Sequence, residues 1–442
     1  MTENKPPKVE TPTSDSIKDA FWVVYMLFFL LGLVHMLPWS FFITAYDVRM
    51  VFVRAGTNLA FQYWMHKFRD TSYDEVDSSH RTSLQTQFSP SLTISIHVST
   101  VLSQLWALLY GRRYSVNMKL SVPLSILLLF FVIEAIFIVV DTDSWQTGFF
   151  TLTMIVVVVI NVMSTIYGMA VYSVLTTLPT EYLGGYLNGQ GMASIFTSCL
   201  QILSLAVGIS YEITALIYFW IGNSTVTLTL VIMLTVMKRN DFYRFHLRNH
   251  RDVDAKMPSI VEIGKIFKKI WPGSVIMIFW ALTGFTVHTS ITSLVVSEGE
   301  GNSDWNDVYF VPVITFLLPA VGEYVGRTVA VKMKISFGEL WLVGFSALRM
   351  FVFVPLVMLC NAQPRQHLPV AFPHDYQYTI IMVAFSLTSG YLASMSSLIV
   401  PNTCGEARRR LPRQHPSDRD IRGNHLFHRV RFGRLVVTTG KL

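Results

Sequence analysis

The run from Lys119 to Val140 reads KLSVPLSILLLFFVIEAIFIVV, and after Lys119 at its start the one charged side chain is Glu134. A helix must be roughly 20 residues long to cross the hydrocarbon layer of a bilayer. A charge at that depth is costly, so natural spans carry few of them. The length and composition of this run therefore predict a transmembrane helix.

Other runs of the same kind lie along the whole chain. Charged residues make up 14% of the 442 positions, against about 25% in soluble proteins, and the mean hydropathy is +0.44. We predict an all-α polytopic membrane protein with about ten transmembrane helices, at 21–46, 89–109, 119–140, 147–172, 189–210, 212–237, 271–296, 308–333, 339–361 and 377–400.

The polar segments divide these helices into groups. The predicted parts are a tail at 1–20, a six-helix bundle at 21–237, a basic loop at 238–270, a four-helix bundle at 271–400 and a basic tail at 401–442. The last tail carries ten Lys or Arg and three acids, and its excess of +7 equals the net charge of the chain. The basic isoelectric point therefore does not indicate a nucleic-acid partner. We predict a disordered tail, with contact to anionic membrane lipid as the alternative.

The charges of the loops predict an orientation. The loop at 238–270 holds nine Lys or Arg, whereas the loop at 297–307 holds none. Lys and Arg gather on the cytoplasmic side of membrane proteins, so we expect the N-terminus in the cytoplasm. Within the basic loop, Ser259 and Glu262 have the spacing of a capping box. They predict either an amphipathic helix on the inner surface or an extension of the seventh span.

Charged residues within the predicted spans are candidates for function. Glu323 and Arg327 are four residues apart, hence neighbours on one helix face. They are predicted to pair, either to hold a polar solute or as a structural ion pair. Arg349 is expected to find a structural or gating partner on another helix. Glu134 is a candidate for proton coupling, with a structural glutamate as the alternative.

Breaks and small residues mark further candidates. Pro38 is expected to bend its helix and free a carbonyl, directly before Trp39, whose ring offers a stacking face for an aromatic solute. The alternative is an ordinary kink with Trp39 packed against lipid. Gly189, Gln190 and Gly191 permit close helix approach with an amide that bonds across it. His35 lies in the first span, where packing or pore lining is expected.

Motifs of enzymes and metal sites are missing from the sequence. It contains no P-loop, nucleophile elbow or HExxH motif, and its three cysteines have no metal spacing. We expect neither an enzyme, nor a cofactor, nor a bound metal.

Several motifs together resemble the equilibrative nucleoside transporter family. They occur in collinear order between about residues 19 and 396, at 25–32, 37–39, 41–45, 188–191, 309–313, 326–327, 349–355, 372–375 and 390–394. The resemblance implies a fold similar to the major facilitator superfamily with eleven helices, a cytoplasmic N-terminus, and facilitated diffusion of nucleosides without sodium or a cofactor.

The resemblance also implies roles for individual residues. Trp39 matches the family's tryptophan beside the nucleoside, and Met36 and Ile43 are its apolar neighbours. Arg327 matches the arginine that contacts the ribose, and Glu323 stands where the family has aspartate.

Besides Glu323, other positions depart from the family pattern. Ser40 replaces an asparagine, and Gly168 replaces the fourth-helix glutamine that reads the base. The resemblance also ends near Ser396, where arginines follow. We hypothesise that the last family helix is replaced here, which would leave the C-terminus in the cytoplasm.

These observations favour a passive nucleoside transporter of the plasma membrane. One alternative is a carrier of organic cations or nucleobases, coupled to protons through Glu134 or Glu323. Another is a non-transporting isoform that only associates with a full-length partner. The sequence does not predict the oligomeric state.

Overall fold

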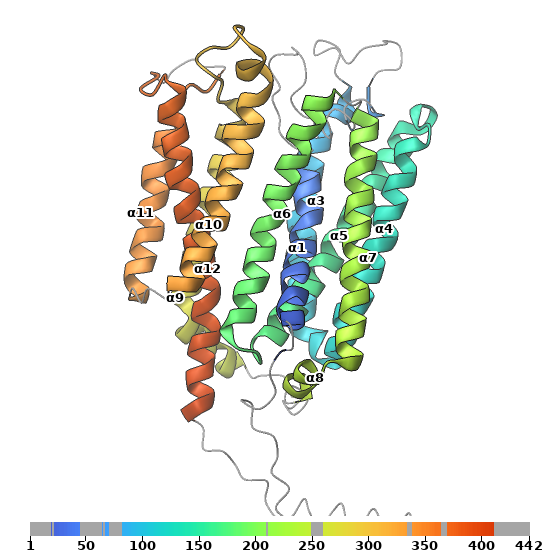
Figure 1. Ribbon diagram of the computed structural model, residues 1–442, viewed down its shortest axis with the longest axis vertical. Helices are drawn as coiled ribbons and strands as arrows, with labels where there is room; N and C mark the ends of the chain where they lie inside the picture. The colour runs from blue at the N-terminus through green and yellow to red at the C-terminus, as the bar shows by residue number, and fades with distance from the viewer. Residues whose placement is uncertain are drawn as a thin grey trace, which may run out of the picture. The chain divides into compact units, whose positions relative to one another are not determined.

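The computed structural model describes residues 19, 22–44, 64, 67–69, 82–208, 211–248, 260–333, 338–363 and 369–410, apart from the side chains of a few helical positions. Long helices run side by side (Figure 1). The first group comprises α1 (Val23–Thr44), α3 (Ser83–Tyr110), α4 (Val116–Val139), α5 (Gln146–Leu175), α6 (Thr180–Val207) and α7 (Tyr211–Arg239). The second comprises α9 (Ile260–Gly284), α10 (Leu318–Met333), α11 (Glu339–Met358) and α12 (Asp375–Arg410), with the short helix α8 (Asp241–Arg248) between the groups.

The all-α membrane fold is confirmed. In the described part of the chain, nine helices are long and apolar enough to cross a membrane, and α1 is a further apolar helix. Their positions match the ten predicted spans. The described residues form no strand, only two isolated bridges, Val295 with Ala362 and Cys360 with Phe372. The division into two bundles stays a prediction.

Some helix boundaries differ from those predicted. α3 begins at Ser83 rather than 89 because Thr82 caps it: the Thr82 hydroxyl accepts from the Gln85 amide at 3.1 Å, and the Gln85 side chain accepts from the Thr82 amide at 2.9 Å. α6 begins at Thr180, so Gly189, Gln190 and Gly191 lie inside it and not at its start, where the predicted span at 189–210 placed them.

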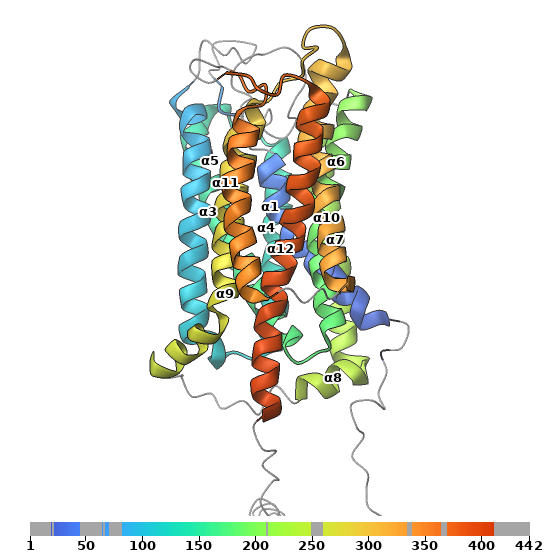
Figure 2. The ribbon, with the colours of Figure 1, turned by 90° about the vertical axis from the view of Figure 1, so that its left-hand side faces the viewer.

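The basic loop is shorter than predicted. α9 is one helix from Ile260 into the seventh span, with Pro272 inside it, and Figure 2 shows its first part bent away from the rest. The proposed cap, Ser259, lies outside the described residues. α8, which the sequence did not predict, follows α7 and packs Phe242 against Tyr182 of α6, with 5.4 Å between ring centroids.

The seventh and eighth spans are interrupted by π-helical segments. These are η4 (Phe285–Ile291), directly after α9, and η6 (Trp305–Tyr309) and η7 (Val311–Leu317), before α10. Such wide turns are rare and often lie at functional sites. The hydrophobic pattern of a span does not distinguish them from α-helix.

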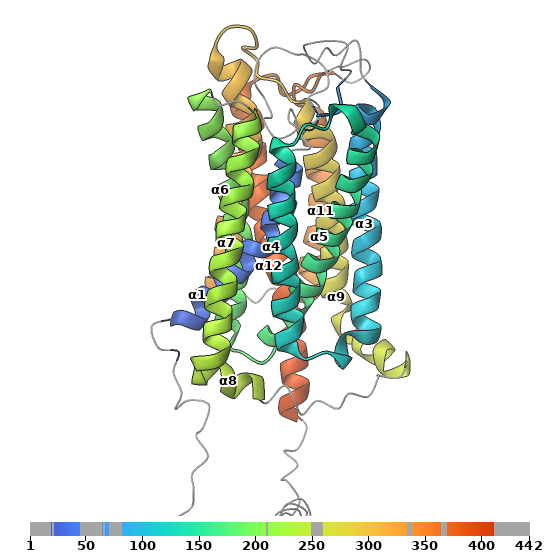
Figure 3. The ribbon, with the colours of Figure 1, turned by 90° about the vertical axis from the view of Figure 1, so that its right-hand side faces the viewer.

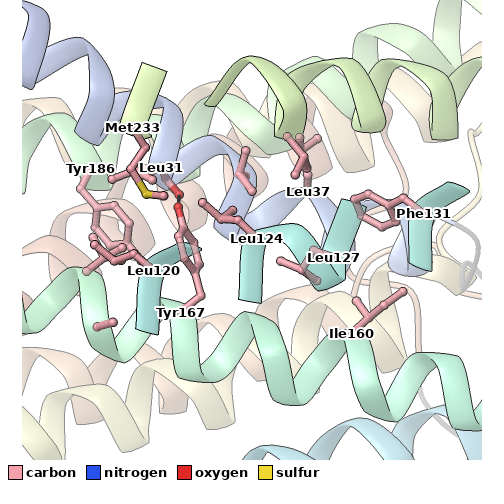
Figure 4. Packing of buried hydrophobic residues seen from close by; sticks show 14 of the residues in the cluster. Leu31, Leu37, Leu120, Leu124, Leu127, Phe131, Ile160, Tyr167, Tyr186 and Met233 are labelled. Atoms are coloured by element: carbon pink, nitrogen blue, oxygen red, sulfur yellow. Dashed lines mark hydrogen bonds between the residues drawn. The ribbon is translucent and has the colours of Figure 1, made fainter. Parts of the chain in front are cut away.

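Two clusters of buried apolar side chains fill the fold. The larger joins α1 and α3–α8, and Figure 4 shows part of it, with Tyr167 of α5 directed towards Leu31 of α1. The Tyr167 hydroxyl donates to the Leu31 carbonyl at 2.7 Å. The smaller cluster joins the π-helical segments, α11 and α12 around Phe310, Met382 and Phe385. Figure 3 shows α4 and α7, both of the first helix group, side by side.

α6 packs between α1 and α10 (Figure 1). Glycines allow the backbones of α6 and α1 to approach closely. A β-carbon at Gly189 of α6 would overlap the Phe29 carbonyl oxygen, and a β-carbon at Gly32 of α1 would overlap the Tyr186 carbonyl oxygen. Without a strong hydrophobic force between helices in lipid, such close packing is a main source of association. α6 is therefore fixed on α1 while its other face meets α10.

Residues 399–442 form a separate unit. In it α12 continues to Arg410, ten residues beyond the predicted end of the span at 400. This helical stretch covers the first part of the segment that was predicted to be disordered. Residues 411–442, with the rest of the predicted tail, lie outside the described residues.

Candidate functional site

An ion pair on α10 is the centre of the site. Arg327 donates to Glu323 Oε1 through Nη2 at 2.6 Å and through Nε at 3.2 Å. The pairing predicted from the four-residue spacing is confirmed. The side chain of Arg327 is 9% exposed and that of Glu323 26%, so the carboxylate is partly open while the guanidinium is enclosed.

Gln190 of α6 joins this pair to the other helix group. Arg327 Nη1 donates to Gln190 Oε1 at 3.2 Å. Beside this contact, Oγ1 of the next residue on α10, Thr328, donates to Asn188 Oδ1 at 3.3 Å. Gly191 brings the two helices together, since a β-carbon there would lie 3.3 Å from the ring of Tyr324. A charged pair on α10 is thus tied to polar side chains of α6.

The network continues from Gln190 to α1. The Nε2 of Gln190 lies 3.0 Å from His35 Nδ1, and the Tyr186 hydroxyl lies 2.6 Å from the same nitrogen. The rings of His35 and Tyr186 are stacked with 5.9 Å between centroids. One continuous chain of polar contacts therefore runs from His35 through Gln190 to Arg327 and Glu323.

His35 also faces Gly168 of α5. A β-carbon at Gly168 would lie 2.5 Å from His35 Nε2 and 2.6 Å from Cε1, closer than atoms of real structures approach. The absence of a side chain at Gly168 is what gives the imidazole its room. Among the described residues no hydrogen bond is made by His35 Nε2, and His35 as a whole residue is half-buried.

The remaining α1 candidates follow His35 along the helix. Met36 is partly exposed, and Pro38 is buried inside α1. The side chains of Trp39, Ser40 and Ile43 lie outside the described residues, although the α1 backbone reaches Thr44.

The comparisons with known proteins agree with this architecture. The family model of nucleoside transporters matches residues 154–263 and 250–412, which together make up more than half of the chain. The chain belongs to the nucleoside transporter family. The matched part includes Gly168, Gln190, Glu323, Arg327 and Arg349, so the network lies largely within the residues that match the family model.

Relatives match over most of their length. The chain is 28% identical to equilibrative nucleoside transporter 1 of Rattus norvegicus, over 88% of this chain and 92% of the relative. It is 28% identical to equilibrative nucleoside transporter 1 of Homo sapiens, over 88% and 91%. It is 25% identical to equilibrative nucleoside transporter 3 of Rattus norvegicus, over 91% and 87%.

Arg349 of this family member lies on α11 and bonds to α12. Its Nε donates to Thr388 Oγ1 at 3.0 Å and its Nη2 to the Phe385 carbonyl at 3.0 Å. The guanidinium also lies 4.3 Å from the centroid of the Phe385 ring, a cation–π contact. The residue is 2% exposed. These contacts give the arginine the partner on another helix that the sequence required.

Glu134 is not brought to the network. It is 2% exposed within α4, which packs against α5 and α7. A distinct cavity of about 420 Å³ opens near the end of α4, where Lys67, Arg69, Asp141 and Asp143 line it. It contains no residue of the network.

Sequence reasoning gave His35 and Tyr186 no specific role. His35 is a single histidine in an apolar span, and Tyr186 lies between two glycines and the 188–191 motif without belonging to that motif. Their importance arises from contacts between α1, α5 and α6 that no local spacing encodes. The one available signal was the departure at Gly168, where the resemblance implies a glutamine and this chain has no side chain.

Proposed function

We propose that this protein carries nucleosides across a membrane by facilitated diffusion, without sodium or a cofactor. Family membership supports the solute class, because the relatives are equilibrative nucleoside transporters. The observation that carries the proposal is the Glu323–Arg327 pair, which is held by Gln190 where α10 meets α6.

The pair suits a ribose. Only Oε1 of Glu323 bonds to Arg327 within the described residues, which leaves Oε2 of the partly exposed carboxylate to accept from a sugar hydroxyl. The guanidinium supplies donors for the sugar oxygens. Charged side chains inside a membrane are costly unless they pair, and here Glu323 and Arg327 pair with each other. Trp39, Met36 and Ile43 are the proposed apolar contacts of the base, with Ser40 and Gly168 beside them.

The position of the pair supports alternating access. The ribose contacts would come from α10 and the base contacts from α1 and α5, which belong to different helix groups. A rocking motion of the groups would expose the solute to either side in turn. Gln190, with Gly189 and Gly191 beside it, would act as the gating contact.

We also propose the plasma membrane as the location, with both termini in the cytoplasm. The basic loop between α7 and α9 supports this orientation. A C-terminal epitope tag should be stained by antibody only after cells are permeabilised. Staining of intact cells would contradict the proposed C-terminal side.

The proposed function is tested by uptake of radiolabelled adenosine and uridine into nucleoside-transport-deficient cells. Wild type should give saturable uptake that is unchanged when choline replaces sodium. Glu323→Gln should abolish it at equal surface expression, whereas Glu339→Gln, at an exposed acid at the start of α11, should leave it intact. No uptake by surface-expressed wild type would overturn the proposal.

A further inference from the structure

We propose that His35 reads the nucleobase, in the place of the glutamine that the family has at the position of Gly168. The proposal rests on the proposed nucleoside transport. It assigns His35 Nε2 as a hydrogen-bond donor to an acceptor atom on the base.

The donor follows from a chain of fixed hydrogen-bond roles that begins at Arg327. A guanidinium has only donors, so the atom of Gln190 at 3.2 Å from Arg327 Nη1 must be the amide oxygen. This contact fixes the orientation of the Gln190 amide, which otherwise is ambiguous between oxygen and nitrogen. The amide nitrogen therefore faces His35.

The orientation of Gln190 then fixes the tautomer of His35. An amide NH₂ group is a donor only, so His35 Nδ1, at 3.0 Å from Gln190 Nε2, must be the acceptor. The Tyr186 hydroxyl, 2.6 Å from the same nitrogen, then also donates a hydrogen bond to it. A neutral imidazole with an accepting Nδ1 carries its proton on Nε2. The free edge of His35 is thus a donor.

The Nε2–H group is clear of α5. The β-carbon position of Gly168 is almost equally far from Nε2 and Cε1, 2.5 and 2.6 Å. It therefore lies against the ring over the bond between these two atoms, not in line with the N–H. Within the described residues Nε2 makes no hydrogen bond, and His35 as a whole residue is half-buried.

Position and volume link this donor to the base site. His35 precedes Met36 and lies one helical turn before Trp39 on α1, the helix proposed to contact the base. Its ring occupies the space that a side chain at Gly168 would fill. The family's glutamine presents donors and an acceptor, whereas His35 presents one donor. Uptake by this protein should therefore depend on an acceptor atom of the nucleobase that faces His35 Nε2, and a donor on the base at the same place should not increase uptake.

Two amide variants separate this role from a structural one. His35→Gln extends its amide to about the position of Nε2 and keeps a donor there. His35→Asn places its amide oxygen near the position of Nδ1, so it keeps the contact to Gln190 and Tyr186 but removes the outer donor. The substrates are adenosine and its 1-deaza, 3-deaza and 7-deaza analogues, each of which lacks one ring acceptor.

Wild type and His35→Gln should take up at least one deaza analogue about two- to tenfold less efficiently than adenosine, the effect of one lost hydrogen bond. His35→Asn should lose this discrimination. Equal discrimination in His35→Asn and wild type, or no discrimination in wild type, would overturn the proposal while leaving nucleoside transport intact. Absence of adenosine uptake by wild type would instead overturn the proposed function itself.

A second measurement covers the case in which His35→Asn does not reach the surface. Diethylpyrocarbonate labelling of wild-type protein, read by mass spectrometry, should show adenosine protecting His35 and not the exposed His374, whose side chain is 51% exposed. Equal labelling of His35 with and without adenosine would contradict a contact between them.

Discussion

The imidazole of His35 on α1 lies against the backbone of Gly168 on α5, where a β-carbon would come within 2.5 Å of Nε2. The two positions are complementary: the histidine fits only because the glycine has no side chain. We therefore treat them as one unit of the site, although they are far apart in the sequence.

The first prediction concerns the space at Gly168. Gly168→Ala should displace the His35 ring, break its contacts to Tyr186 and Gln190, and lower uptake by about tenfold, as the loss of one or two buried hydrogen bonds would. Uptake rates at equal surface expression measure this. Gly264→Ala, where a β-carbon meets nothing within 4 Å, is the matched control. An unchanged rate in Gly168→Ala would show that the contact is unimportant.

How far the site was predictable differs between its parts. The helix at 119–140 and the Glu323–Arg327 pair depend on local composition and spacing, and both are present in the structure. The ability of Gln190 to bond across helices was also expected from its small neighbours. The pairing of His35 with Gly168, and the π-helical turns before α10, depend on which helices meet in space. No periodicity of a single span encodes such contacts.

Arg327→Lys tests the geometry of the guanidinium. Lysine keeps the charge but lacks the planar fork that bonds Glu323 and Gln190 together. Losing a charge-assisted hydrogen bond costs about 1.5–3 kcal/mol, so transport efficiency should fall roughly 10- to 100-fold. Uptake kinetics at equal surface expression provide the measurement.

The exchange variant Glu323→Arg with Arg327→Glu is the companion to this test. It can restore an ion pair on α10 but puts a carboxylate near Gln190 Oε1. It should reach the surface and stay inactive. Full activity would indicate that the pair is only structural.

Close packing of α1 on α6 gives a stability prediction. Gly189→Ala would drive a methyl group into the Phe29 carbonyl oxygen, and overpacking of this kind costs about 1–3 kcal/mol. The purified protein in detergent should unfold at a lower temperature. Gly344→Ala, where an added β-carbon would meet no atom within 4 Å, should keep the wild-type unfolding temperature. An equal fall of the unfolding temperature in both variants would argue against the close approach of α1 and α6.

Arg349 is expected to stabilise the contact between α11 and α12. Thr388→Val removes the acceptor of its Nε and leaves the buried cation with one bond fewer. The melting temperature should fall by an amount that corresponds to about 1–3 kcal/mol, with the Michaelis constant for adenosine unchanged. A changed Michaelis constant with full stability would move Arg349 into the solute site.

Glu134 should not couple transport to protons. It lies on α4, outside the network that joins α1, α6 and α10. Glu134→Gln should therefore keep adenosine uptake and its response to external pH. A pH response that is present in wild type and lost in this variant would restore Glu134 as a coupling residue.

Counterflow in proteoliposomes tests the central claim most directly. Purified protein is reconstituted, the vesicles are loaded with unlabelled uridine, and tracer uridine is added outside with no ion gradient. A facilitated carrier that alternates access should accumulate the tracer transiently above its equilibrium level, and Glu323→Gln vesicles should not. Tracer entry in wild-type vesicles that matches protein-free vesicles would contradict nucleoside transport by this protein.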